Sequence, residues 1–146
     1  MESETVILIQ PLLEEHFSRF GVIFRLNRSD PQPFQVQVTE ETPVGWRVAM
    51  MKVSARVIQK ISCHPNTMET FEPVQGVCLL VVAEPQKPHE LAAFVLDAPV
   101  CINKGVWHCV ITLSDYAIVK VTENSTVDSM TVELEGTLRA GLRAEE

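Results

Sequence analysis

Apolar and polar residues alternate in short stretches along most of this 146-residue chain, and turn-forming residues separate the stretches. A period of two puts successive side chains on opposite faces of an extended backbone, so this alternation predicts strands. The last stretch is expected to be a strand or a short helix. The expected strands span residues 5–10, 22–26, 34–38, 45–53, 55–61, 68–74, 76–84, 91–96, 106–113, 116–123 and 130–135.

One early segment, residues 11–21, has a helical pattern instead. Pro11 suits the first position of a helix and Gly21 suits its end. Leu13, Phe17 and Phe20 fall on one face at helical spacing. These short strands, together with one short N-terminal helix, predict an all-β fold, either a barrel or a double-sheet jelly roll.

The length of 146 residues suits a single domain, 1–146, in which the polar residues 136–146 could form a flexible tail. Within it, the apolar run "GVCLLVVA" predicts a central strand covered on both faces.

Charge and cysteine spacing restrict the class of partner. The net charge is -7 and the 12 Lys and Arg residues are scattered, so nucleic-acid binding is not expected. No apolar stretch approaches the ~20 residues that span a bilayer, so no membrane association is expected. The four cysteines lack C-x-x-C spacing and the first ten residues lack the pattern of a secretion signal, which predicts a cytoplasmic protein with reduced thiols.

Strand alternation also limits which histidines and cysteines can share a pocket. In "GVWHC", Val106, His108 and Val110 are expected on one face, and Trp107 and Cys109 on the other. The same alternation separates Cys63 from His64. A metal site built from either adjacent histidine–cysteine pair is therefore not expected.

The order of the remaining candidates resembles the two motifs of the cupin jelly roll. His64, Glu69 and Gly76 follow the spacing of the first motif, with Ser62 where its first histidine would stand. Gly105 and His108 fit the G-x-x-H of the second motif.

Two imidazoles and a carboxylate in one pocket can hold a divalent metal, or can transfer protons without one. The alternative is structural: His64 caps a turn, Glu69 is solvated and His108 is a hydrogen-bonded histidine of the barrel. No cofactor is certain, and a divalent metal is one possibility.

Several longer motifs resemble the ureidoglycolate lyase family, formerly called ureidoglycolate hydrolases, within the cupin superfamily. "PLLEEHFSRFG" is similar to the family's opening P-L-x-x-E-x-F-x-x-[YF]-G, and "CHPNTMETFEPVQG" resembles its R-H-P-x-[GT]-x-[QE]-x-F-x-P-x-x-G. "INKGVWHCVITL" resembles its x-[RK]-x-V-W-H-x-P-L. These blocks follow the family order along much of the chain.

The resemblance implies a homodimeric, cupin-like double-stranded β-helix. It also implies an enzyme that releases urea and glyoxylate from ureidoglycolate, a small carboxylate, in allantoin and purine catabolism. Elimination of urea needs a base, an acid and a cation for the carboxylate. We assign Glu69 and His108 to proton transfer, His64 to polarising the substrate or to metal binding, and Lys104, at the family's basic position, to the carboxylate.

The sequence departs from the family pattern at defined places. Cys63 stands where the family has arginine, Val110 replaces a proline, and "VAMMKVSARVIQKI" replaces a longer segment that carries another arginine. Two other functions therefore remain open: a metal-dependent isomerase or decarboxylase that acts on a different small carboxylate, and a cupin that binds a small anion without catalysis.

Overall fold

The computed structural model describes residues 5–142. This part of the chain forms eleven strands and one short helix. None of its helices is long and apolar enough to span a membrane. In chain order the elements are β1 (Thr5–Gln10), α1 (Glu14–Phe17), β2 (Gly21–Ile23), β3 (Trp46–Val53), β4 (Ile58–Cys63), β5 (Glu69–Gln75), β6 (Cys78–Ala83), β7 (Ala92–Val95), β8 (Val100–Ile102), β9 (Trp107–Thr112), β10 (Ala117–Asn124) and β11 (Met130–Gly141).

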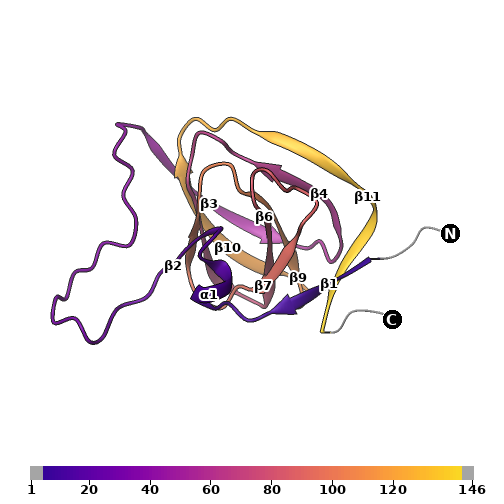
Figure 1. Ribbon diagram of the computed structural model, residues 1–146, viewed down its shortest axis with the longest axis horizontal. Coiled ribbons are helices and arrows are strands. Elements are labelled where there is room, and N and C mark those ends of the chain that lie inside the picture. The colour runs from indigo at the N-terminus through magenta and orange to yellow at the C-terminus, as the bar shows by residue number, and fades with distance from the viewer. Residues whose placement is uncertain (1–4, 143–146) are drawn as a thin grey trace.

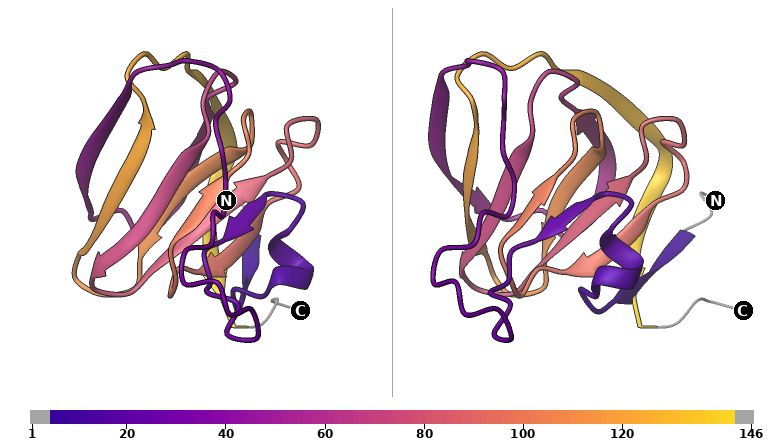
Figure 2. Two further views of the ribbon diagram at one scale, coloured as in Figure 1. Left: turned by 90° about the vertical axis from the view of Figure 1, so that its left-hand side faces the viewer. Right: turned by 60° about the vertical axis from the view of Figure 1, so that its left-hand side comes forward.

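The strands form a closed barrel and a sheet packed beside it (Figure 1). Six strands close the barrel in the order β1-β11-β4-β9-β6-β7, and five form the second sheet in the order β2-β8-β5-β10-β3. Strand β1 closes the barrel by pairing in parallel with both β11 and β7. In the left view of Figure 2, β3, β10 and β5 lie side by side in the second sheet. The predicted all-β, cupin-like jelly roll with one short N-terminal helix is confirmed.

Two hydrophobic cores flank the barrel wall formed by β6, β7 and β9. One core fills the barrel and includes Leu79, Val81 and Trp107. The other lies between this wall and the second sheet and includes Leu80 and Val82. Every residue of β6 is buried because its alternating side chains enter different cores, so the predicted two-sided burial is confirmed.

The N-terminal helix is shorter than expected. It covers Glu14–Phe17 rather than residues 11–21, and Leu13 precedes it in an extended conformation without a side-chain cap. Its role is packing: Phe17 and Phe20 are buried against Phe94 of β7, with ring centroids 5.2 and 5.8 Å away.

The strand expected at 34–38 does not form, because the alternating pattern there has no core to face. Phe34 and Val36 are 84% and 66% exposed. The side-chain oxygens of Gln35 and Gln37 accept hydrogen bonds from the backbone N–H groups of residues 27 and 25, which replaces a strand ladder with local contacts. In Figure 1 this irregular segment, residues 24–45, loops away from the body of the molecule.

Strand β8 lies inside a stretch, residues 97–105, that was expected to be only a turn-rich link. Its three residues are too few to show alternation, and all three are buried. At the other end, β11 continues to Gly141 and so occupies much of the 136–146 segment for which a tail is predicted. Residues 143–146 lie outside the described part of the chain.

The contact between the helix and the barrel gives a test of the fold. We expect Phe94→Ala to lower the free energy of unfolding by about 3–5 kcal/mol, because a fully buried ring leaves a cavity between Phe17 and Phe20. Phe34→Ala is the matched control and should change stability by less than about 0.5 kcal/mol. Urea unfolding of both variants measures the difference, and equal midpoints would contradict this packing.

Candidate active site: a histidine–glutamate–histidine cluster

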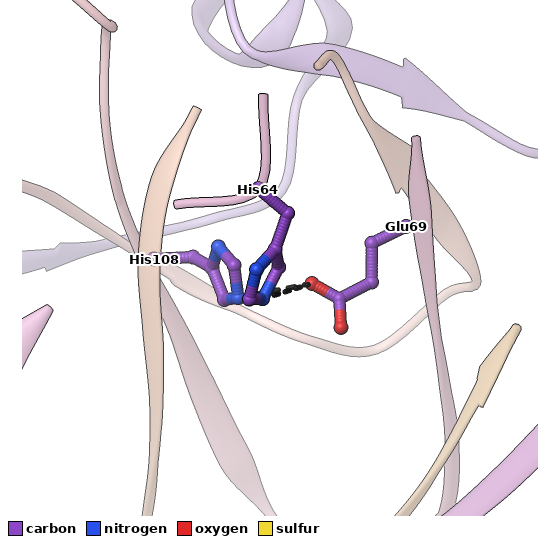
Figure 3. A group of neighbouring side chains, drawn as sticks. All are labelled: His64, Glu69 and His108. Atoms are coloured by element: carbon purple, nitrogen blue, oxygen red, sulfur yellow. Dashed lines mark ion pairs between the residues drawn. The ribbon is translucent and has the colours of Figure 1, made fainter. Parts of the chain in front are cut away.

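Three of the four predicted site residues meet between the barrel wall and the second sheet (Figure 3). Glu69 Oε1 lies 2.9 Å from His108 Nε2 and 3.8 Å from His64 Nε2. The two imidazole centroids are 5.0 Å apart. All three side chains are largely shielded, with 9–15% of each exposed.

Each residue reaches the cluster from a different strand end. Glu69 is the first residue of β5, His108 is the second residue of β9, and His64 directly follows β4. Strands β4 and β9 pair at Ser62 and His108, which brings the two histidines to the same end of the barrel. Alternation separates His108 from Trp107 and Cys109, whose side chains belong to the barrel-filling core, as predicted.

The outer ring nitrogens of both histidines are held by backbone carbonyls. His64 Nδ1 lies 3.1 Å from the Asp128 carbonyl and 2.9 Å from Ser129 Oγ. His108 Nδ1 lies 3.2 Å from the Val106 carbonyl. A carbonyl can only accept, so each Nδ1 donates its proton to the backbone and each Nε2 faces Glu69.

Two loops are tied together around the cluster. The Asn66 side chain donates to the Thr126 carbonyl and accepts from the backbone N–H of Asp128. This joins the loop that follows β4 to the loop that precedes β11. The backbone N–H of Gly105 donates to the His64 carbonyl at 3.2 Å, and Gly105 has a φ of 82°, a conformation that favours glycine. This hydrogen bond fixes the segment that carries Gly105 and His108 against the loop that carries His64.

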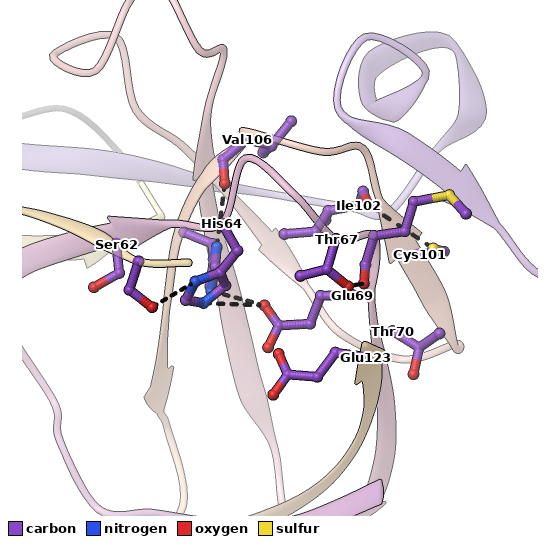
Figure 4. Close-up of polar contacts among 12 residues, drawn as sticks. Ser62, His64, Thr67, Glu69, Thr70, Cys101, Ile102, Val106 and Glu123 are labelled. Carbon is purple, nitrogen blue, oxygen red and sulfur yellow. Dashed lines mark hydrogen bonds and ion pairs between the residues drawn. The ribbon is translucent and has the colours of Figure 1, made fainter. Parts of the chain in front are cut away.

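A second carboxyl group, that of Glu123 on β10, lies beside Glu69 (Figure 4). Burial opposes ionisation of Glu69, but His108, Glu123 and His64 outweigh it and lower the pKa of Glu69. Burial and the neighbouring Glu69 raise the pKa of Glu123 against the opposing effect of Arg47. The site therefore contains one carboxyl group that ionises readily and one that holds its proton more strongly.

The donor set fits a divalent metal ion. Glu69 Oε1 and the two Nε2 atoms lie within 4.8 Å of one another. The same Oε1 is buried and lacks a hydrogen bond of good geometry, although His108 Nε2 is only 2.9 Å away. Three lone-pair-bearing atoms that converge on one point repel each other unless a metal ion or an added proton lies between them.

Lys104, the fourth predicted site residue, lies outside this cluster. Its Nζ forms an ion pair with Glu40 Oε1 at 2.6 Å, and this contact lowers the pKa of Glu40. The Lys104 charge is thus already paired with a carboxylate from the irregular segment 24–45.

Glu123 and Arg47 are absent from the sequence prediction, although a signal for Glu123 exists. Along β10, the inward positions of Ala117, Val119 and Val121 are all apolar and buried. Continuing that alternation places Glu123 on the same inward face, where a charge is costly without a partner. Arg47 is that partner, and its Nη2 lies 2.7 Å from Glu123 Oε2.

Comparison with solved structures finds several matches of distant sequence, among them an oxalate decarboxylase and a sugar isomerase. Bacillus subtilis oxalate decarboxylase matches with a TM-score of 0.46 and 18% identity over 62% of this chain and 24% of its own. This chain thus corresponds to about a quarter of that protein. A dTDP sugar isomerase from Desulfovibrio desulfuricans G20 matches with a TM-score of 0.42 and 18% identity, over 82% of this chain and 73% of its own. A search of curated proteins finds no match.

A comparison with family models gives a match over most of the sequence. The model for ureidoglycolate lyase matches residues 35–138, which include His64, Glu69 and His108 as well as the Arg47–Glu123 pair. The chain therefore belongs to the ureidoglycolate lyase family.

Proposed function

We propose that the cluster of His64, Glu69 and His108 catalyses the release of urea from ureidoglycolate, with glyoxylate as the second product. The observation that carries this proposal is the convergence of Glu69 Oε1 and two imidazole Nε2 atoms within 4.8 Å in a shielded site. The pathway that fits this reaction is allantoin and purine catabolism, as the family implies.

The reaction needs two proton transfers and no redox partner. The hydroxyl group on the central carbon loses its proton, and a carbonyl forms as the carbon–nitrogen bond breaks. The electron pair of that bond goes to the nitrogen, which takes up a proton and leaves as urea. Atoms and charge balance without water, so one base and one acid are sufficient.

The chain supplies both groups in one version of the site. Glu69 has a lowered pKa and is ionised at neutral pH, so it can accept the hydroxyl proton. With Nδ1 held by the Val106 carbonyl, a His108 ring that is also protonated at Nε2 can deliver that second proton to the departing nitrogen. His64, whose Nε2 faces the same Glu69 oxygen as His108 Nε2, then polarises the substrate. Positioned acid–base groups of this kind typically contribute about 10²–10⁴-fold in rate.

In the other version, His64, Glu69 and His108 would hold a divalent metal ion, which would supply positive charge to an oxygen of the substrate. Charge balance favours added positive charge in either version. Two carboxyl groups and one guanidinium lie at the site, so a metal ion or a protonated imidazole would offset the negative charge that an anionic substrate meets there.

Substitution of the cluster tests the proposed reaction. We expect Glu69→Gln and His108→Asn each to lower kcat for ureidoglycolate by about 10²–10⁴-fold while the protein remains folded by circular dichroism. Glu72→Gln is the matched control on the same strand, because Glu72 pairs with Lys120 instead. Retention of wild-type turnover in both site variants would refute the assignment. Binding of small acids without turnover by the wild-type protein would favour a non-catalytic cupin.

Metal removal and return separates the two versions of the site. After chelation, we expect a divalent ion to bind once per chain and to raise the melting temperature by ~5–10 °C at 100 times its Kd. Glu69→Gln and His64→Gln should each abolish the shift, because each removes one converging ligand atom. Elemental analysis measures the bound metal. Full activity in metal-free protein would exclude the metal version.

A homodimer in the cytoplasm completes the proposal. Trp46, Val48 and Met50 alternate along β3, the edge strand of the second sheet, and are 72%, 47% and 59% exposed. An apolar stripe on a sheet edge suits a second copy of the chain. The four free cysteines suit a reducing compartment, which cell fractionation would check.

The edge strand gives the test of the dimer. Sedimentation should find a dimer for the wild-type protein and a monomer for the double variant Trp46→Glu/Met50→Lys, which places charges in the stripe. Leu26→Lys, at a residue 60% exposed in the irregular segment, is the control and should remain dimeric. A monomeric wild-type protein at high concentration would contradict the dimer.

A further inference from the structure

Three charged residues form a row across neighbouring strands of the second sheet. Glu123 of β10 pairs in register with Glu69 of β5 on one side and with Arg47 of β3 on the other. Residues directly opposite one another in antiparallel strands point to the same face of the sheet. Arg47 therefore projects from the same face as Glu69, two strands and about 10 Å away along the row.

The row runs from the shielded cluster to solvent. The side chains of Glu69 and Glu123 are each 9% exposed, whereas that of Arg47 is 53% exposed. Arg47 thus stands at the open end of the row, where a ligand that enters the cluster from solvent would meet it.

Glu123 holds only one edge of the Arg47 guanidinium. Nε and Nη2 both donate to Glu123 Oε2, at 2.9 and 2.7 Å. Among the residues that the structure describes, Nη1 has no hydrogen-bond partner, and the planar group keeps further N–H donors. The ion pair therefore orients the guanidinium without using all of its donors.

We propose that Arg47 binds the carboxylate of the substrate and selects small 2-hydroxy and 2-oxo acids, with Glu123 as its positioning residue. This inference rests on the proposed function, because it names the group that holds the substrate at the same site. A guanidinium fork matches the two oxygens of a carboxylate and cannot lose its charge at neutral pH. Bound in this way, the acid places its 2-carbon toward Glu69 and the two imidazoles.

Lys104 is less suited to this role on geometric grounds. Its partner Glu40 lines a pocket of about 440 Å³ that Glu123 also lines. Thr70, which follows Glu69 in the sequence, and Thr122, which precedes Glu123, line the same pocket. Alternation points both threonine side chains to the face of the sheet opposite the cluster. The single ammonium group of Lys104 is also already engaged at 2.6 Å.

Binding of two probes, a charged carboxylate and its uncharged amide, tests the inference without a need for turnover. Oxamate carries a carboxylate where oxamide carries an amide, so their difference in affinity reports the carboxylate contact. We expect Arg47→Gln to weaken oxamate binding by about 10- to 100-fold in calorimetry and to leave oxamide binding unchanged. Arg47→Lys should restore part of the loss, because it keeps the charge but not the fork. Arg56→Gln is the control, since Arg56 is 54% exposed and pairs with Asp115 on the surface.

Kinetics with ureidoglycolate add a second readout. Arg47→Gln should raise KM about 10- to 100-fold with a smaller change in kcat. Glu123→Gln should also raise KM, because it removes the ion pair that orients the Arg47 guanidinium. Equal weakening of oxamate and oxamide by Arg47→Gln would mean a structural role and would overturn the inference.

Two further outcomes separate this inference from the proposed reaction. Normal oxamate affinity in Arg47→Gln together with a loss in Lys104→Gln would overturn the inference, even if the wild-type protein releases glyoxylate. Conversely, an Arg47-dependent affinity for oxamate in a wild-type protein without lyase activity would support the carboxylate site and refute the reaction.

Discussion

Burial of β6 on both faces is the constraint on which the rest of the structure depends. A strand with apolar residues at every position must be covered twice, and one closed barrel can cover only one of its faces. The five-stranded sheet covers the other. Two cores therefore share one wall, and the layer between wall and sheet is where inward-facing residues of β5, β9 and β10 meet.

The candidate active site is the polar end of this otherwise apolar layer. Going along β10, Ala117, Val119 and Val121 pack into the core before Glu123 reaches the site. Phe71 of β5 lies against the His108 ring, with centroids 5.4 Å apart, and so separates the polar cluster from the core below it. Low solvent access raises the pKa of Glu123 by burial, with the neighbouring Glu69 adding to the effect. It also strengthens the contacts with His108, Glu123 and His64 that outweigh burial and lower the pKa of Glu69.

The sequence was sufficient for the parts that follow from local periodicity. Alternation predicted most strands and placed Trp107 and His108 on opposite faces of one strand. Motif spacing predicted that His64, Glu69 and His108 share one pocket, and the structure places them together. It was insufficient where a long-range contact decides the outcome. Phe34 and Val36 alternate like a strand, but no partner strand reaches them.

The same limit applies to the cations of the site. Lys104 stands at the family's basic position, yet Glu40, sixty-four residues earlier, pairs with it. Arg47 and Glu123 are seventy-six residues apart, and only the pairing of β3 with β10 brings them together. Spacing along the chain carries no information on such pairs, so their identification required the sheet register.

The central claim is that this site breaks the carbon–nitrogen bond of ureidoglycolate by elimination. The most direct measurement is the product balance of the purified protein, with glyoxylate, urea and ammonia quantified in the same reaction and corrected for spontaneous decay. We expect glyoxylate and urea in equal amounts, with no ammonia. Release of ammonia, or no glyoxylate above the spontaneous rate, would contradict it.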